Sequence, residues 1–318
     1  MLNSRRSFLT LLFAFFAVAS LSVNAQDKDK PKKPEIVYNG PAVMWRAPND
    51  IATRNLLIGA GGEAMKPDLS RVTFVEVKTG GWSTKYRVKD GKGNEWVAKL
   101  SKEAQPETAA NRLLWAIGYE TEIAHLVPEL VIEGKGTFKN VKLEARPDSV
   151  KRAGFWTWAS NPFVGKPEFQ GLKIMMVLFN NWDMKDDNNA ILAVKGDANS
   201  ERRFIVSDLG ATFGKTGGII SRSRNKPSDY VKSDFVKAVR GNLIDFSYGG
   251  KNGKLFEDIT VNDARWLAGW LGKLSDEQIK DAFRSANYTP EEVDQLAAAV
   301  RARINALANP ASAVTAKN

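Results

Sequence analysis

The stretch FNNWDMKDDNN, residues 179–189, decides the interpretation of this sequence. It follows the apolar run LKIMMVLF at 172–179 and ends in a group of aspartates and asparagines. Burying such groups costs free energy unless hydrogen bonds, opposite charges or a metal ion compensate them. The segment is therefore either an ordinary polar turn or the place where the protein does chemistry.

Two acidic segments carry the candidate chemistry in the second half of the sequence. Asp183, Lys185 and Asn188 form a D-x-K-x-x-N pattern within the first segment. Asp208 lies in the second segment, VSDLG, at the end of a run with strand-like composition, and Gly210 allows a sharp turn after it. Carboxylate and amide oxygens are the ligands that Mg²⁺ prefers.

Two further charged residues come earlier in the sequence. Lys99 lies near the end of the strand-like segment WVAKL, and Glu107 opens a helix predicted over 105–120, where apolar residues recur at helical spacing. A lysine on a strand, a glutamate on the next helix, D-x-K-x-x-N and then D-x-G is an order that resembles the protein-kinase-like fold. SDLGATFG in particular is similar to the D-x-G segment of divergent members, such as the HipA-like, Fam20-like and phosphatidylinositol-kinase-like groups.

The resemblance implies a role for each of these side chains. Asp183 would orient or deprotonate an acceptor hydroxyl, and Lys185 would neutralise charge on the transferring phosphoryl group. Asn188 and Asp208 would hold Mg²⁺ or Mn²⁺, with Asp186, Asp187 and Asn189 as alternative ligands. The residues expected to position the triphosphate of ATP are Lys99, Glu107, Gly80, Gly81 and Ser83.

Several features depart from the usual pattern of that fold. There is no G-x-G-x-x-G motif; KTGGWSTKY at 78–86 occupies its place and would cap phosphates through backbone N–H groups, unless it is a plain hairpin turn. Asn181 and Trp182 replace the histidine and arginine that usually precede the catalytic aspartate. No A-P-E segment follows, so ordinary docking of a protein substrate is not expected. SRSRNK at 221–226 is either a solvated loop or a contact for an anionic substrate.

The resemblance covers about residues 72–300 and implies an α+β, two-lobed fold with a β-rich N-terminal lobe and a mainly helical C-terminal lobe. Most strand-like segments lie before about residue 148, and two of them flank the turn DGKGN at 90–94. Two further short strands are predicted within 188–210. The long helical patterns lie near the C-terminus, where Ser275 with Gln278 and Thr289 with Glu292 have the spacing of capping boxes. The expected division is a signal peptide at 1–25, a flexible linker at 26–36, the N-terminal lobe at 37–148, the C-terminal lobe at 149–308 and a disordered tail at 309–318.

The N-terminal residues have the layout of an export signal. A basic head is followed by an apolar run and then by VNA, which suits cleavage after Ala25. SRRSFL at 4–9 matches the twin-arginine pattern, and the general secretion route stays open. An uncleaved membrane anchor is the alternative. We expect an exported protein, periplasmic or extracellular.

Charge and composition limit the classes of partner. The chain carries 46 Lys and Arg against 36 Asp and Glu, and removal of residues 1–25 leaves a net charge of +8. Such a surplus favours anionic partners, including a membrane surface. Nucleic acid is disfavoured, because no basic helix interleaved with aromatic residues is present. The chain has no cysteine, which excludes thiolate chemistry, and its single histidine, His125, disfavours a histidine-based metal site or triad.

Two functional hypotheses follow. The first is an exported kinase-like phosphotransferase that binds Mg²⁺ and ATP between two lobes and transfers the γ-phosphoryl group to a hydroxyl of a protein, lipid or sugar. The alternative is a catalytically silent module of the same fold that binds an anionic cell-surface or lipid ligand, since nucleoside triphosphate is scarce outside the bacterial inner membrane. An exported structural protein, in which the polar cluster is a coincidence, is a third interpretation.

Overall fold

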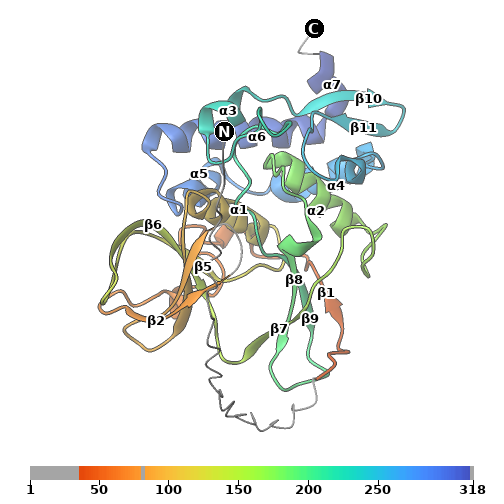
Figure 1. The fold of residues 1–318 in the computed structure, drawn as a ribbon. Coiled ribbons are helices and arrows are strands. Elements are labelled where there is room, and N and C mark those ends of the chain that lie inside the picture. Colours follow the sequence, from red (N-terminus) through yellow and green to blue (C-terminus); the bar gives the residue numbers. More distant parts are fainter. Residues whose placement is uncertain (1–35, 80–82, 316–318) are drawn as a thin grey trace, which may run out of the picture. The chain divides into compact units, whose positions relative to one another are not determined.

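The computed structural model describes residues 36–79 and 83–315 of the chain (Figure 1). The chain divides into two compact units, residues 1–36 and 37–318, and the elements below all belong to the second. The signal peptide predicted at 1–25 lies outside the described residues, as do Gly80 and Gly81. None of the helices in the described ranges combines the length and apolar character needed to cross a bilayer.

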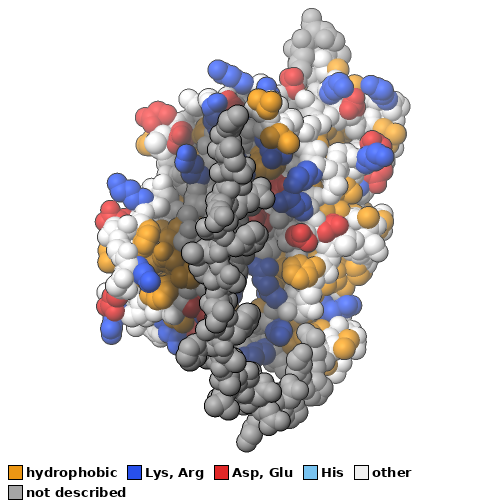
Figure 2. Space-filling view, in the orientation of Figure 1, with side chains coloured by type: hydrophobic (Ala, Val, Ile, Leu, Met, Phe, Trp, Pro, Cys, Tyr) orange, Lys and Arg blue, Asp and Glu red, His pale blue; other side chains and the backbone are white. Residues whose placement is uncertain are grey.

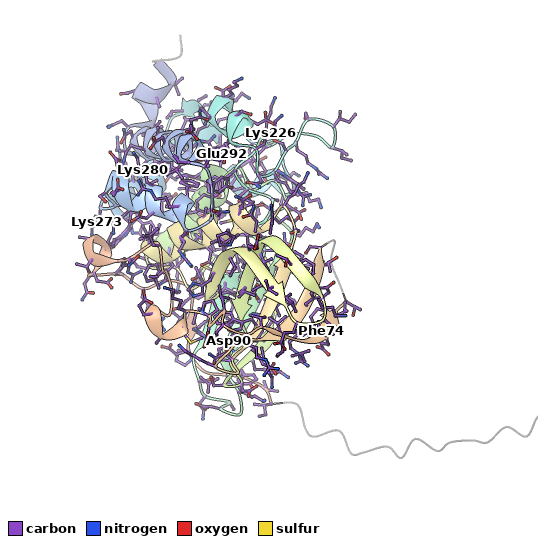
Figure 3. All side chains as sticks on the ribbon, turned by 90° about the vertical axis from the view of Figure 1, so that its left-hand side faces the viewer. Phe74, Asp90, Lys226, Lys273, Lys280 and Glu292 are labelled. Carbon is purple, nitrogen blue, oxygen red and sulfur yellow. The ribbon has the colours of Figure 1, made fainter. Side chains whose placement is uncertain are left out.

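The first half of this unit is dominated by a five-stranded antiparallel sheet. Its spatial order is β2 (Thr73–Lys78), β3 (Thr84–Lys89), β4 (Glu95–Leu100), β6 (Gly136–Ala145) and β5 (Ala124–Ile132). The turn expected between the second and third of these segments is confirmed. In it, Asp90, which Figure 3 labels, accepts hydrogen bonds from the backbone N–H groups of Lys92 and Asn94 and from the indole of Trp96.

The two faces of this sheet have different environments because side chains alternate along a strand. Trp96 and Ala98 of β4 lie on one face, in a small core that the segment around Met65 also contacts. Partly buried aromatic residues extend this core, and Figure 2 shows hydrophobic side chains exposed over the sheet. Val97 and Lys99 therefore belong to the opposite face, toward the helix that follows.

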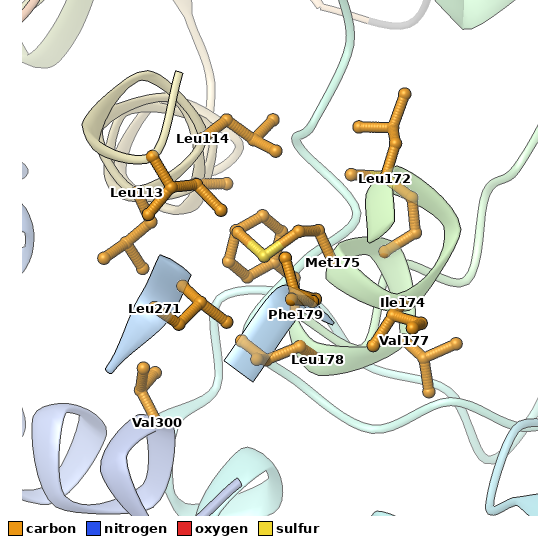
Figure 4. Packing of buried hydrophobic residues seen from close by; sticks show 14 of the residues in the cluster. Leu113, Leu114, Leu172, Ile174, Met175, Val177, Leu178, Phe179, Leu271 and Val300 are labelled. Atoms are coloured by element: carbon orange, nitrogen blue, oxygen red, sulfur yellow. The ribbon is translucent and has the colours of Figure 1, made fainter. Parts of the chain in front are cut away.

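That helix, α1 (Ala104–Ala116), confirms the helix predicted at 105–120 and joins the sheet to the helical region. Leu113 and Leu114 are buried in the large core that α2 (Pro167–Leu178) also enters (Figure 4). The helix ends just before Gly118, whose φ of 100° is left-handed. A Cβ at that position would lie 2.1 Å from the carbonyl oxygen of Arg46, so only glycine fits the turn.

A second sheet has the order β1 (Ala42–Val43), β9 (Arg202–Val206), β8 (Asn189–Val194) and β7 (Val150–Gly154). β8 and β9 are the two short strands predicted from the sequence. β1 pairs in parallel with β9, so residues 42–43, expected in the N-terminal lobe, contact a strand of the later half.

Helices form most of the remainder, as expected. They are α3 (Pro227–Lys232), α4 (Val261–Leu271), α5 (Asp276–Arg284), α6 (Pro290–Ala308) and α7 (Pro310–Thr315). The predicted capping boxes, Ser275 with Gln278 and Thr289 with Glu292, are present. The unit is thus rich in β-sheet toward its N-terminus and helical toward its C-terminus, which is the α+β class predicted.

Two parts of the helical region differ from the sequence expectation. The antiparallel hairpin of β10 (Val236–Arg240) and β11 (Leu243–Phe246) was not foreseen. α7 lies within 309–318, where a disordered tail was expected. Short 3₁₀ helices complete the elements at Ile51–Thr53, Glu63–Met65, Asp186–Asn188 and Gly253–Phe256.

Candidate functional site

The polar segment after α2 begins with a reversal of the chain. Asn180 has a φ of 55°, and its side-chain amide donates to the carbonyl oxygen of Gly214 at 2.7 Å. The buried guanidinium of Arg303 donates to the carbonyl oxygen of Leu178 at 2.8 Å and to Oδ1 of Asn180 at 2.9 Å. These hydrogen bonds satisfy carbonyl groups at the C-terminal end of α2 that have no partner within the helix. The chain then turns out of the core toward Asp183.

Asp183 is held between two lysines. The Nζ atom of Lys185 lies 3.1 Å from Oδ2, and the Nζ atom of Lys251 lies 2.8 Å from Oδ1. Partial burial opposes the charge of Asp183, but hydrogen bonds from Lys251 and Lys185 outweigh it, and the pKa of this carboxyl lies below its ordinary value. Asp183 is therefore ionised at neutral pH.

Asn188 connects Asp183 to Asp208. Its side-chain amide donates to the carbonyl oxygen of Asp183 at 2.6 Å, and no described residue donates a hydrogen bond to its Oδ1, which could serve as a ligand. Its own carbonyl oxygen accepts the backbone N–H groups of Ser207 at 2.7 Å and Asp208 at 3.1 Å. The backbone N–H of Gly210 donates to Oδ1 of Asp208 at 3.0 Å and fixes that carboxylate at the start of the turn.

Lys99 completes the connection on the sheet side. Its Nζ atom lies 2.6 Å from Oε2 of Glu107 and 3.4 Å from Oδ1 of Asp208. Burial disfavours the ammonium, but the charges of Glu107 and Asp208 more than compensate, so the pKa of Lys99 is raised. The pKa of Asp208 is lowered, because Lys99 and the Gly210 N–H outweigh the effect of burial. The structure thus brings Asp183, Asn188, Asp208, Lys99 and Glu107 into one continuous set of contacts.

Lys142 is a second buried lysine that the sequence analysis missed. It lies on β6 directly opposite Lys99, is 1% exposed, and its Nζ atom lies 2.5 Å from Oε1 of Glu107. Glu107 therefore binds one lysine with each oxygen. Apolar and polar residues alternate in KNVKLEA. Val141 and Leu143 lie in the small core with Trp96, so Lys142 belongs to the opposite face of the sheet, together with Lys99.

Lys251 is the second functional residue that the sequence analysis missed. It belongs to a short segment that packs on the chain around Trp182. The hydroxyl of Tyr248 donates to the carbonyl oxygen of Asn181 at 2.8 Å. The backbone N–H of Lys251 donates to the carbonyl oxygen of Trp182 at 2.9 Å. A Cβ on Gly250 would lie 2.6 Å from the Cα of Trp182, so the close approach depends on glycine. No local sequence pattern predicts the contact between Lys251 and Asp183.

Four of the residues described above line a cleft of about 630 Å³: Lys99, Glu107, Asn188 and Asp208. Asp183 and its two lysines are not among the lining residues. Lys78, Thr79 and Lys85 line it from the β2–β3 side, and Asp208 and Asn188 line it from the opposite side. Ser83 lies half-buried just before β3 and is not among the lining residues, while Gly80 and Gly81 fall outside the described part of the chain. The charged residues Glu144, Arg146 and Arg152 also line the cleft. Phe155, which is exposed, lines it as well.

The donor set fits a metal ion that arrives with a nucleotide. Among residues 36–79 and 83–315, no group of three or more His, Cys, Asp or Glu side chains is placed to hold a metal. Asp208 offers a carboxylate and Asn188 a free amide oxygen, and Mg²⁺ is commonly bound by one or two carboxylates together with phosphate oxygens and water. Asp187 also lines the cleft and stays an alternative ligand.

Comparison with known proteins bears on the fold. No protein-family model matches the sequence, and no curated protein is significantly similar to it. The crystal structure of the Helicobacter pylori proinflammatory kinase CtkA is similar with a TM-score of 0.50 and 11% identity, covering 79% of this chain and 99% of that one. The Rio2 kinase of Chaetomium thermophilum, in an ADP/Mg²⁺-phosphoaspartate complex, gives a TM-score of 0.34 and 14% identity over 76% and 74% of the two chains. The likeness to CtkA shows the fold alone, and the chain accordingly has a protein-kinase-like fold, as the order of its motifs predicted.

Proposed function

We propose that the protein binds ATP and Mg²⁺ in the cleft of about 630 Å³ and transfers the γ-phosphoryl group to a hydroxyl acceptor. The observation that carries this proposal is the unbroken set of contacts from Glu107 through Lys99, Asp208 and Asn188 to Asp183. Phosphoryl transfer needs positioned charges more than covalent chemistry, and these contacts supply them.

In this proposal Lys99, held by Glu107 at 2.6 Å, supplies a fixed positive charge for the α- and β-phosphates. Asp208 and Asn188 would hold Mg²⁺, which neutralises charge on the phosphate oxygens. The acceptor oxygen bonds to the γ-phosphorus while the bond from that phosphorus to the β,γ-bridging oxygen breaks, and ADP leaves. Mn²⁺ would suit the same oxygen donors.

The charge state of Asp183 defines its part in the transfer. A carboxylate whose pKa is lowered by two lysines is a weak base, so Asp183 accepts a hydrogen bond from the hydroxyl and aligns it. The proton leaves late, to the transferred phosphoryl group or to solvent. Lys185 and Lys251, which both contact Asp183, would neutralise the charge of the transferring group and of an anionic acceptor.

Thermal denaturation with nucleotide and metal tests the proposal. ATP should raise the melting temperature only when Mg²⁺ or Mn²⁺ is present, because a ligand that binds the folded state alone stabilises it. Asp208→Asn should abolish this rise. Asp294→Asn, an exposed carboxylate of α6 paired with Lys280, is the matched control and should retain it. No rise with ATP, GTP or ADP and either metal would contradict the proposal, and transfer of labelled γ-phosphate to candidate acceptors would then not be expected.

A silent binding module remains the second candidate because of one observation. Lysines contact both oxygens of Asp183, which weakens it as a base, and Arg146 and Arg152 line the cleft, so an anion could bind in the cleft without any transfer. This candidate predicts no thermal response to nucleotide. It also predicts retention on anionic polymer or lipid that weakens as salt is added.

We further propose that the protein acts outside the cytoplasm. The support is the sequence of residues 1–25, with its basic head, apolar run and VNA before Gln26. Fractionation of cells that express the full chain should place a shortened product outside the cytoplasm. Replacement of Arg5 and Arg6 by lysine should block export if the twin-arginine route is used, and should leave it intact if the general route is used.

A further inference from the structure

Residues 215–223 form a closed loop beside the candidate site. The backbone N–H of Ser223 donates to the carbonyl oxygen of Lys215 at 3.0 Å, and the backbone N–H of Lys215 donates to Oγ of Ser223 at 2.9 Å. At the tip, the carbonyl oxygen of Gly218 accepts the N–H groups of Ser221 at 3.0 Å and Arg222 at 3.1 Å. The residues between Lys215 and Ser223 therefore project as a defined loop from a closed neck.

The tip of this loop consists of two exposed isoleucines. Ile219 is 82% exposed and Ile220 is 102% exposed, higher than any other large hydrophobic side chain in the described ranges. Single exposed apolar residues are common on proteins, but two adjacent ones at full exposure on a projecting tip indicate a surface that something else covers.

The flanks of the tip are basic. Residues 215–226 contain Lys215, Arg222, Arg224 and Lys226 and no acidic residue. Arg224 is paired with Glu103, and Lys226 lies 3.1 Å from Asp229. The guanidinium of Arg222 stacks on the ring of Trp182 at 4.1 Å and makes no salt bridge with any residue that the structure describes.

The loop is fastened to the candidate site on both sides. The indole N–H of Trp182, the residue before Asp183, donates to the carbonyl oxygen of Ser223 at 2.9 Å. The backbone N–H of Gly249, two residues before Lys251, donates to Oγ1 of Thr216 at 3.3 Å. The base of the loop is therefore fixed to the segments that carry Asp183 and Lys251.

We propose that the 215–223 loop is a membrane-docking loop. Ile219 and Ile220 insert into the headgroup–acyl boundary of an anionic bilayer, and Lys215 and Arg222 contact its phosphate groups. The docked surface presents a headgroup hydroxyl to Asp183, which makes a lipid the acceptor. The acceptor assignment rests on the proposed phosphoryl transfer, whereas the docking itself does not.

A bilayer fits this surface better than a protein partner does. Stable protein interfaces bury about 800 Å² on each partner around an apolar centre. Two side chains at the tip of a narrow loop between glycines and cations provide no such centre. A bilayer requires only a few inserted apolar side chains, and each basic residue near an anionic leaflet strengthens the attraction. The net charge, +10 for the full sequence and +8 without residues 1–25, acts in the same direction.

A site-specific label tests the docking. The chain has no cysteine, so Ile220→Cys in the full chain accepts one environment-sensitive fluorophore, and Val131→Cys, 60% exposed on β5, is the matched control. Vesicles of phosphatidylcholine with about 30% phosphatidylglycerol should increase and blue-shift the emission at position 220, and the effect should weaken at high salt. Pure phosphatidylcholine should have little effect, and position 131 should not respond to either vesicle.

Vesicle sedimentation gives the size of the effect. Replacing both isoleucines by serine should weaken binding to the anionic vesicles by ~10-fold, and Arg222→Gln by ~5-fold, because apolar insertion and headgroup charge each contribute. Both variants change exposed side chains, and equal melting temperatures would verify their folding. Unchanged binding of the serine variant together with no response at position 220 would overturn the proposal and leave the isoleucines to a protein partner.

The two proposals fail separately. Asp208→Asn should lose the thermal response to ATP and Mg²⁺ but should bind vesicles as the unaltered protein does. Vesicle binding through the loop in a protein that ignores nucleotide would reject phosphoryl transfer and retain the docking. Transfer of labelled phosphate to a soluble acceptor at a rate that the serine variant shares, with no transfer to lipid, would reject a lipid acceptor.

Discussion

The single histidine of the chain allows a quantitative prediction about stability and pH. His125 lies on β5, is 8% exposed, and contacts the edge of Trp96 with 5.9 Å between ring centroids. Its Nε2 atom has no hydrogen-bond partner among the described residues. Burial first, and then the positive charges of Arg112 and Lys66, lower the pKa of His125 to about 4, although a hydrogen bond to the Met65 backbone opposes this.

The direction of the effect follows from the two states. In the unfolded chain the pKa of histidine is about 6.5, so between about pH 6.5 and pH 4 the unfolded state binds a proton that the folded state does not. The contribution of His125 to the free energy of unfolding is therefore fully present above pH 6.5, the pKa in the unfolded chain. It is lost as the pH falls toward about 4, the pKa in the folded protein. Since each pH unit in this window is worth about 1.4 kcal/mol, lowering the pH from about 7 to about 5 should cost ~2 kcal/mol of unfolding free energy.

Urea unfolding at the two pH values measures this loss. His125→Asn keeps a donor for the Met65 carbonyl but does not titrate, so the variant should lose ~2 kcal/mol less than the unaltered protein over the same interval. The comparison cancels contributions from carboxyl groups, which both proteins share. Equal losses in the two proteins would refute the reasoning, because they would mean that His125 charges as readily in the folded state as in the unfolded chain.

Three further predictions concern the candidate site. Glu107→Gln removes the carboxylate nearest to two buried lysines, although Glu144 stays 3.1 Å from Lys142 and Asp208 stays 3.4 Å from Lys99, and it should lower the free energy of unfolding by about 3 kcal/mol in urea titrations. Lys142→Met, which leaves Glu107 paired with Lys99, should cost less than half as much. Asn188→Ala should remove the thermal response to ATP and Mg²⁺, whereas Asp187→Ala should retain it. The reverse result would identify Asp187, and not Asn188, as the metal ligand. Lys251→Met removes a cation that lowers the pKa of the neighbouring aspartate, so the acid limb of the transfer activity should shift to higher pH, and an unshifted profile would contradict that coupling.

The sequence predicted those parts of the site whose chemistry lies in short segments. D-x-K-x-x-N places Asp183 and Asn188 within one turn of chain, and D-x-G supplies both the carboxylate of Asp208 and the N–H that fixes it. The order of these segments resembles that of the protein-kinase-like fold, and the fold was predicted from this resemblance.

Residues that act through long-range packing were not predicted. Lys142 reaches Glu107 only because β6 pairs with β4 in a register that puts it opposite Lys99, and register depends on the whole sheet. Lys251 depends on the packing of a glycine-containing segment against Trp182, far away in the sequence. Both lysines look like ordinary surface charges when only their neighbours in the sequence are considered.

Two missed elements have different explanations. The hairpin of β10 and β11 had a local signal, since Gly241 and Asn242 separate two segments rich in β-branched and apolar residues, and that signal was overlooked. α7 had almost none: it is a short, weakly patterned helix that follows α6 after Asn309. Short helices gain most of their stability from tertiary packing, which composition does not reveal.

The double attachment of Glu107 has a consequence for how activity could be controlled. One carboxylate ties α1 to lysines from two different strands, and the far end of the same helix is embedded among Leu113, Leu114 and the large core. Outward tilting of α1 would break both ion pairs and expose that apolar surface together. We therefore expect no dormant form maintained by displacement of this helix. If the proposed phosphoryl transfer is correct, its regulation would depend on the supply of nucleotide and the encounter with the acceptor.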